Sequence, residues 1–117
     1  MRYSFNIIFA IILGGSISLS AQAAPKTDRA LVQPGKVHEL CIPLGFGQKL
    51  EYGFVSRRAM NFNIHYHVGE RVEFPVAEHL AREKNEIFTA MDDQTHCLMW
   101  TNPNERGQWV NVIYNIR

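Results

Sequence analysis

Apolar and polar residues alternate with a period of two along nearly all of the chain after residue 36. Successive side chains of an extended strand point to opposite faces, so this period predicts strands with one buried face. Strands of this kind are typical of antiparallel sheets. The inward positions predicted by the pattern are Leu40, Ile42, Leu44, Leu50, Tyr52, Phe54, Phe62, Ile64, Tyr66, Val72, Phe74, Val76, Leu98, Trp100, Val110, Val112, Tyr114 and Ile116.

Turn-forming residues separate the alternating segments at intervals of about eight to twelve residues, which is typical of a β-sandwich. We therefore predict an all-β fold, a single antiparallel β-sandwich of about seven strands. Residues 77–86 interrupt the alternation and are expected to form a loop, with a helical turn as the alternative. The predicted turns are Gly45-Phe46-Gly47, Ser56-Arg57-Arg58, Gly69, Asp92-Asp93 and Asn102-Pro103-Asn104.

The first residues have the pattern of a secretory signal peptide. Arg2 precedes a short apolar run, and Ala21 and Ala23 provide the small residues that a signal peptidase requires. We expect a signal peptide over 1–23, with an uncleaved membrane anchor as the alternative. Residues 24–35 are polar and rich in turn formers, which predicts a flexible lead-in before a single domain over 36–117.

Length and charge limit the function further. The chain has 117 residues with 12 basic and 11 acidic side chains, and removal of Arg2 with the signal peptide makes these numbers equal. No basic run is present, so nucleic acid is not an expected partner. No second apolar run follows the signal peptide, so we expect no transmembrane segment after cleavage and a periplasmic or secreted location.

Two cysteines remain after cleavage, Cys41 and Cys97. The alternation places both on the outward face, so they can form a disulfide if their strands are neighbours. The oxidising environment outside the cytoplasm favours this interpretation. In the alternative, both thiols stay reduced and bind a metal ion.

The stretch FNIHYH, residues 62–67, places two imidazoles two positions apart on one strand. Because the apolar residues of this stretch face the core, Asn63, His65 and His67 are expected on the polar face. His65 and His67 could hold a metal ion, and imidazole with sulfur ligands suits copper. The alternative is an ordinary polar surface with no cofactor. His96 is expected to face the core.

No pattern of catalytic residues is recognisable. Ser56 is the only serine after the signal peptide, and no histidine is near it in sequence. We therefore predict that the protein is not an enzyme. Trp109 falls on the outward face and, with Asn63, is a candidate for contact with a partner, which could be a protein or a small ligand.

The order of four segments resembles the GOLD domain, a β-sandwich of Golgi cargo adaptors, in its small exported bacterial form. These segments are LCIPL, GQKLEYGFVS, MNFNIHYH and CLMWTNPNERGQWVNVIYNI, and the resemblance extends over about residues 36–117. It implies a non-enzymatic module that contacts proteins or lipid assemblies and has no catalytic residues. The chain differs from the eukaryotic members in lacking a coiled coil and a transmembrane segment. The predicted function is thus an exported, non-enzymatic binding module, with a periplasmic copper protein that uses His65 and His67 as the alternative.

Overall fold

The computed structural model describes residues 24–117, so the predicted signal peptide over 1–23 lies outside the described residues. The described chain contains strands and turns and no helix, which confirms the prediction of an all-β fold. Its strands are β2 (Lys26–Val32), β3 (Val37–Leu44), β4 (Lys49–Val68), β5 (Arg71–Thr89), β6 (Gln94–Thr101) and β7 (Gln108–Ile116).

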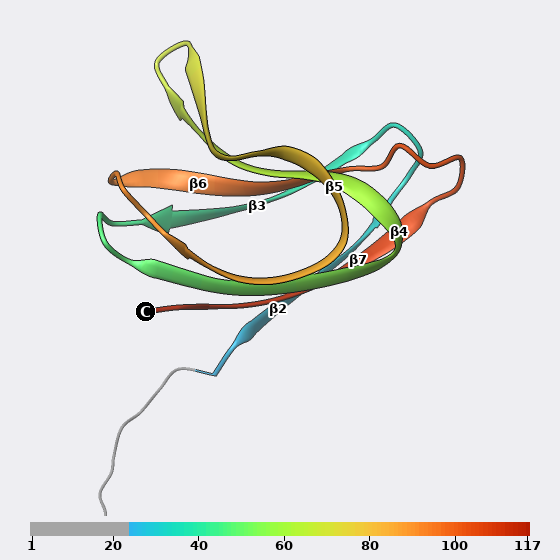
Figure 1. The fold of residues 1–117 in the computed structure, drawn as a ribbon, viewed down its shortest axis with the longest axis horizontal. Helices are drawn as coiled ribbons and strands as arrows, with labels where there is room; N and C mark the ends of the chain where they lie inside the picture. The colour runs from blue at the N-terminus through green and yellow to red at the C-terminus, as the bar shows by residue number, and fades with distance from the viewer. Residues whose placement is uncertain (1–23) are drawn as a thin grey trace, which may run out of the picture.

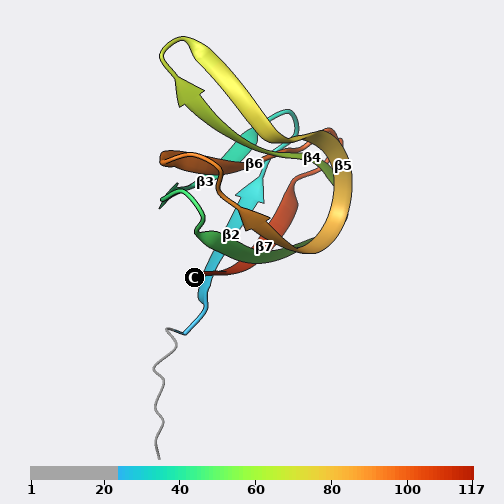
Figure 2. The same ribbon diagram turned by 60° about the vertical axis from the view of Figure 1, so that its left-hand side comes forward.

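All six strands belong to one antiparallel sheet, in which the order β2-β7-β4-β6-β3 is extended by β5 on β4 (Figure 1). β4 holds this sheet together. β5 runs along one edge of β4, whereas the other edge pairs first with β7, over residues 50–56, and then with β6, over residues 61–65. The β4–β5 pair curls between these two groups, and the sheet closes into a half-barrel (Figure 2). The described strands therefore form one curled sheet, whereas the sandwich prediction implied two.

The predicted turn at residues 56–58 is wrong, because β4 continues through it. The pairing of β4 with β5 changes register between Val55 and Met60, which is a β-bulge or a similar irregularity. A bulge adds unpaired residues and bends a strand without reversing it. Ser56, Arg57 and Arg58 thus form the bend of a long strand.

The prediction for residues 77–86 is also wrong, since this segment is the middle of β5. Met60 pairs with Ala81 and Phe54 pairs with Lys84, so the backbone obtains its hydrogen bonds from β4. Tertiary pairing of this kind overrides the helical preference of Glu, Lys and Ala.

The predicted flexible lead-in over 24–35 needs correction, because residues 26–32 form strand β2. β2 pairs with β7 along its whole length, from Lys26 opposite Tyr114 to Val32 opposite Gln108. Val32 is 2% exposed and joins the core, which gives the strand a hydrophobic anchor. A turn follows, with Gly35 at a φ of 75° that favours glycine.

The core lies inside the curl and contains most of the predicted inward residues. Trp100, Phe62 and Phe54 form its centre, with ring centroids 4.8–5.4 Å apart. Tyr52 is 5% exposed, and burial with the nearby Glu86 raises its pKa to about 12. The buried hydrophobic residues are Val32, Ile42, Leu44, Leu50, Tyr52, Phe54, Met60, Phe62, Ile64, Ala90, Cys97, Leu98, Trp100, Val110 and Val112.

Two predicted inward residues, Val72 and Phe74, are exposed instead. They lie on the hairpin between β4 and β5, which projects from the curled sheet (Figure 1). The hairpin extends beyond the core, so neither side chain joins it.

Candidate binding site

Three strands place Cys41, Cys97 and His65 in one row on the outer face of the sheet. Cys41 of β3 lies opposite Cys97 of β6, and Cys97 lies opposite His65 of β4. The predicted disulfide between Cys41 and Cys97 is confirmed. Its neighbour in the row is therefore an imidazole.

His65 and Asn63 point away from the core, as predicted, but they are buried. Only 4% of His65 and 1% of Asn63 is exposed. The Phe74 ring lies beside the imidazole, with centroids 5.8 Å apart, and Glu39 reaches it from β3. Asn63, which was predicted as a contact residue, therefore offers almost no surface to a partner.

Both ring nitrogens of His65 face oxygen atoms. Nδ1 lies 2.8 Å from Oδ1 of Asn63, and Nε2 lies 3.3 Å from Oε2 of Glu39. Burial lowers the pKa of His65, and the charge of Glu39 opposes this effect. The neutral imidazole has one proton for two acceptors, so one nitrogen presents its lone pair to an oxygen.

Ligand atoms of Glu39, His65 and Cys97 lie within 4.8 Å of one another. This is the one such group of His, Cys, Asp and Glu side chains found among residues 24–117, and it does not include His67. The rings of His65 and His67 are 5.2 Å apart at their centroids and nearly perpendicular. Metal binding by His65 and His67, and copper as the ion, therefore remain predictions.

His96 faces the core, as predicted, and is fully buried. Its Nδ1 donates to the backbone oxygen of Gln94 at 2.9 Å. The other nitrogen, Nε2, has no hydrogen-bond partner in the described residues. His96 packs between Tyr66 and Phe88, so its role is that of a core side chain.

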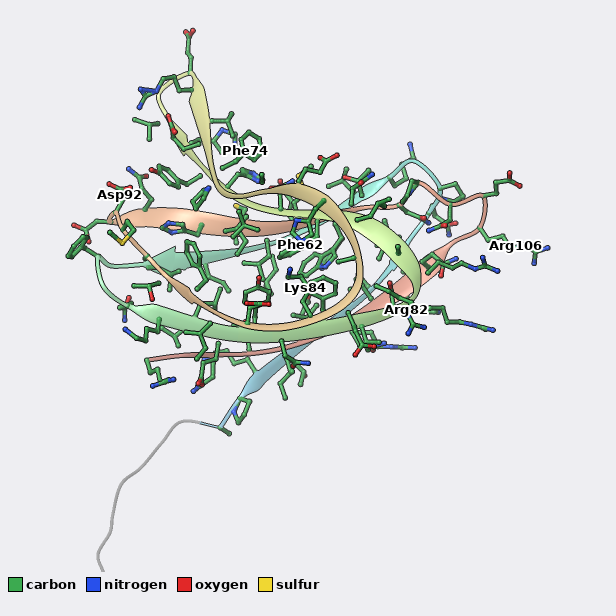
Figure 3. The ribbon with its side chains drawn as sticks, in the orientation of Figure 1. Phe62, Phe74, Arg82, Lys84, Asp92 and Arg106 are labelled. Atoms are coloured by element: carbon green, nitrogen blue, oxygen red, sulfur yellow. A yellow bond between two sulfur atoms is a disulfide. The ribbon has the colours of Figure 1, made fainter. Side chains whose placement is uncertain are left out.

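A second region, at the bend of β4, collects four arginines from three separate parts of the sequence. We call it the arginine groove: a hollow of about 820 Å³ between β4, β5 and the segment that leads into β7. Figure 3 shows Arg82 and Arg106 at the same end of the molecule. The side chains that line the groove are Val55, Ser56, Arg57, Arg58, Arg82, Arg106, Gln108, Trp109 and Asn111.

The charges of the groove are poorly compensated. Arg57, Arg58 and Arg106 form no ion pair with any residue in the described chain, and Arg82 has only Glu83 at 3.8 Å. Both side chains of that pair are about 60% exposed, and a pair this exposed is weak. No acidic residue lines the groove itself. The region therefore presents several guanidinium groups that are free to bind an anion.

Trp109 lies at the margin of the groove and is 44% exposed, as predicted. The guanidinium carbon of Arg29 sits 3.7 Å from the centroid of its ring, so one face of the indole is covered by a cation. The rest of the ring remains available to a ligand.

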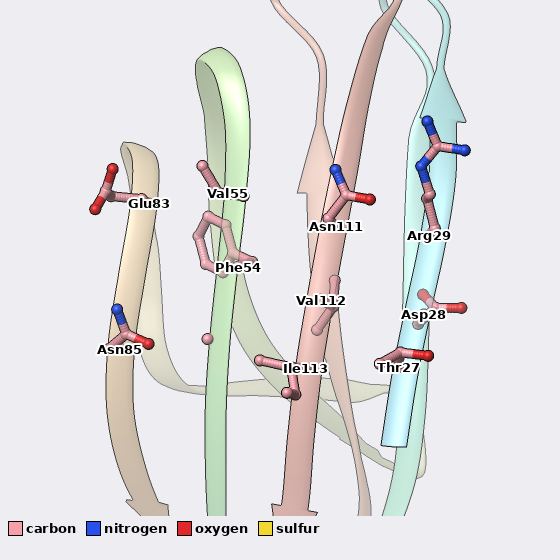
Figure 4. Close-up of a pocket in the computed structure, with 11 residues that line it drawn as sticks. Thr27, Asp28, Arg29, Phe54, Val55, Glu83, Asn85, Asn111, Val112 and Ile113 are labelled. Atoms are coloured by element: carbon pink, nitrogen blue, oxygen red, sulfur yellow. The ribbon is translucent and has the colours of Figure 1, made fainter. Parts of the chain in front are cut away.

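A shallower hollow of about 460 Å³ adjoins the groove and shares Val55 and Asn111 with it. Its residues come from β2, β7, β4 and β5, which lie side by side in Figure 4. Gly53 lines this hollow without a side chain. A Cβ atom at this position would lie 2.5 Å from the amide oxygen of Asn85 and would collide with it.

The arginine groove leaves little trace in the sequence. Arg57 and Arg58 are adjacent, and this pair was the only signal in the sequence. Arg82 joins them because β5 pairs with β4, and Arg106 because the loop before β7 ends beside the bend. Neither contact could be inferred without the strand order.

The serine and the two cysteines of residues 24–117 all have structural partners. The Ser56 hydroxyl donates to the backbone oxygen of Arg58, and both cysteines of residues 24–117 are in the disulfide. The described residues contain no helix that could span a membrane.

Comparison with protein-family models finds no match, and comparison with curated proteins finds none either. Solved structures do match in fold. A mitogen from Yersinia pseudotuberculosis has a TM-score of 0.59 at 9% identity, over 79% of this chain and 85% of that one. The crystal structure of PirA has a TM-score of 0.57 at 10% identity, over 76% of this chain and 93% of that one. The chain thus shares a small all-β fold with both, and the predicted GOLD-like relationship is not confirmed.

Proposed function

We propose that the protein is an exported, non-enzymatic binding module that recognises an acidic glycan through the arginine groove. The observation that carries this proposal is the gathering of four exposed arginines around a hollow with no acidic side chain in its lining. The positive charges of such a cluster repel one another, and a bound anion offsets this repulsion by attracting each of them. The predicted signal peptide and the disulfide support export.

The chemistry of the lining favours an acidic sugar polymer. Guanidinium groups bind sulfate and carboxylate with two parallel hydrogen bonds. The exposed amide of Asn111 can both donate to and accept from hydroxyl groups, and the Trp109 ring offers an apolar face for a sugar ring. A ligand with anionic groups, hydroxyls and flat apolar faces uses all three.

A binding role also agrees with the rest of the molecule. The only serine of residues 24–117 is committed to a backbone oxygen, and its cysteines are bonded to each other. One structural neighbour is named as a mitogen and neither is named as an enzyme, which is compatible with a non-enzymatic role.

The test is a titration of the untagged protein with a size-defined heparin oligosaccharide. The variant Arg82→Gln/Arg106→Gln should bind at least about tenfold more weakly than the wild type, because each lost contact removes a charge-assisted hydrogen bond. The matched control is Arg71→Gln/Arg117→Gln, which removes the same charge from two arginines that already pair with glutamates. The control should bind like the wild type.

Two further ligands show which class of anion the groove binds. Polygalacturonate offers carboxylates without sulfate, and a DNA duplex offers phosphate without a free sugar surface. Equal affinity for DNA and heparin would indicate recognition of charge alone and would contradict the glycan proposal. Equal losses in the groove variant and in the control would show that the groove is not the binding site.

A further inference from the structure

We propose that reduction of the Cys41–Cys97 disulfide converts the outer face of β3, β6 and β4 into a metal site. In the reduced protein, Cys41, Cys97, His65 and Glu39 would bind one zinc or copper(I) ion. While the disulfide is intact, its two sulfurs are bonded to each other and are not available as thiolate ligands, so reduction controls metal binding. This site is separate from the arginine groove and does not depend on the function proposed for it.

The positions of the four side chains carry the inference. Cys41, Cys97 and His65 occupy one row on three neighbouring strands, and Glu39 reaches this row from β3. Ligand atoms of Glu39, His65 and Cys97 already lie within 4.8 Å of one another, and the second sulfur is bonded to the first. Three donors of different kinds therefore lie together, and the fourth, the sulfur of Cys41, is bonded to one of them.

The separations suit a tetrahedral ion. Ligands at about 2.0–2.3 Å from a tetrahedral metal lie about 3.3–3.8 Å from each other. Nε2 of His65 and Oε2 of Glu39 are 3.3 Å apart, within this range. The Cys97 sulfur lies within 4.8 Å of the ligand atoms of both residues, and the two sulfurs can separate once their bond is broken.

His65 is already oriented as a ligand. Its Nδ1 is held by Oδ1 of Asn63 at 2.8 Å, and both side chains are buried. Metal-bound histidines commonly donate their second nitrogen to such an oxygen, which fixes the ring and directs the free nitrogen at the ion. Here that free nitrogen, Nε2, faces Glu39 and the cysteine row. Asn63 would be a positioning residue.

The redox step balances with a thiol reductant. Two electrons and two protons from a dithiol break the sulfur–sulfur bond and leave two protein thiols, and the dithiol becomes a disulfide. Zinc then displaces one proton from each thiol, so binding releases two protons per ion. A disulfide oxidant reverses both steps and releases the metal. Thiolate and imidazole together suit zinc and copper(I).

The experiment compares the untagged protein before and after reduction with a phosphine under anaerobic conditions. Zinc titration of the reduced protein should show one site per chain, and the oxidised protein should bind at least about 100-fold more weakly. Cobalt(II) in place of zinc should give thiolate charge-transfer absorption, which a site without sulfur cannot produce. Equal zinc binding by the two forms, or none by the reduced form, would overturn the proposal.

Variants separate the ligands from their neighbours. His65→Gln should abolish the site, and Asn63→Ala should weaken it by about 10- to 100-fold. His67→Gln is the matched control, because His67 is adjacent on the same strand but outside the group. If His67→Gln removes binding and Cys41→Ser/Cys97→Ser does not, the site is the histidine pair instead and the proposal is wrong.

Folding of the reduced chain is checked by near-UV circular dichroism. If reduction unfolds the protein, addition of zinc should restore the native spectrum, because binding to the folded state stabilises it. An unfolded reduced chain that zinc does not restore would equally overturn the proposal.

Discussion

The guanidinium group of Arg29 lies over the Trp109 ring, with its carbon 3.7 Å from the ring centroid. The two residues come from β2 and β7, the strands nearest the two ends of the described chain. Their contact joins the two strands on the outer face of the sheet. On the inner face, Val110 and Val32 of the same strands belong to the core.

We expect Arg29→Ala to lower the free energy of unfolding by about 0.5–1 kcal/mol, the usual contribution of an exposed cation–π contact. Lys26→Ala, on the same strand, is the control and should have a smaller effect. Urea denaturation followed by circular dichroism measures both. An effect of Arg29→Ala no larger than that of Lys26→Ala would mean that the contact adds nothing to stability.

The disulfide should be the largest single covalent contribution to stability. It joins residues 56 positions apart, for which the chain-entropy account gives about 4 kcal/mol. Replacing both cysteines by alanine should therefore lower the free energy of unfolding by about 2–5 kcal/mol. Denaturant titrations of the variant and the oxidised wild type provide the measurement, and an unchanged midpoint would contradict it.

Stability should decrease at alkaline pH because of Tyr52. Burial raises its pKa from 10.0 to about 12 in the folded protein, so between these values the unfolded chain ionises and the folded protein does not. The unfolded state then binds fewer protons, and the free energy of unfolding falls as pH rises through this window, by up to about 1.4 kcal/mol per pH unit.

Tyr52→Phe removes this titration and should make the decrease between pH 10 and 12 shallower. Denaturant unfolding at several pH values compares the variant with the wild type. Parallel curves over the whole window would show that Tyr52 is not the responsible group.

Gly53 and Asn85 should be energetically coupled. A methyl group at Gly53 would lie 2.5 Å from Oδ1 of Asn85, closer than atoms can pack. We expect Gly53→Ala to destabilise the wild type by about 1 kcal/mol more than it destabilises the Asn85→Ala background. A double-mutant cycle measures this difference, and a coupling near zero would show that the amide simply turns away.

Alternation along the sequence was sufficient to predict the inner face of most strands. The alternation placed Leu98 and Trp100 in the core and Cys97 on the outer face. Cys41 was placed on the outer face in the same way, which allowed the disulfide between the two cysteines to be predicted. The pattern could not locate β2 or the middle of β5, because both lie at the edge of the sheet, where β2 pairs only with the distant β7 and β5 pairs only with β4. Edge strands carry a weaker apolar signal, since they cover less of the core.

The candidate sites were predictable to a similar extent. The direction of His65 followed from its neighbours Ile64 and Tyr66, but its burial did not, because Phe74 and Glu39 arrive from other strands. The arginine groove depends on the irregularity of β4 between Val55 and Met60. The buried apolar residues of β4 keep the same alternation on both sides of it, so the sequence carries no clear mark of the bend.

The position of β2 has a consequence for how the molecule folds. β2 is the first strand of the described chain, and its only partner in the sheet is β7, the last. During synthesis β2 must wait until residues 108–114 have emerged before its hydrogen bonds can form. Pairing between such distant segments slows folding, because the entropy of closing the chain is lost before any contact is gained. β7 is also the partner of β4 over residues 50–56, so this part of β4 stays unpaired on one edge until β7 has been synthesised. Folding assistance will matter most in that interval.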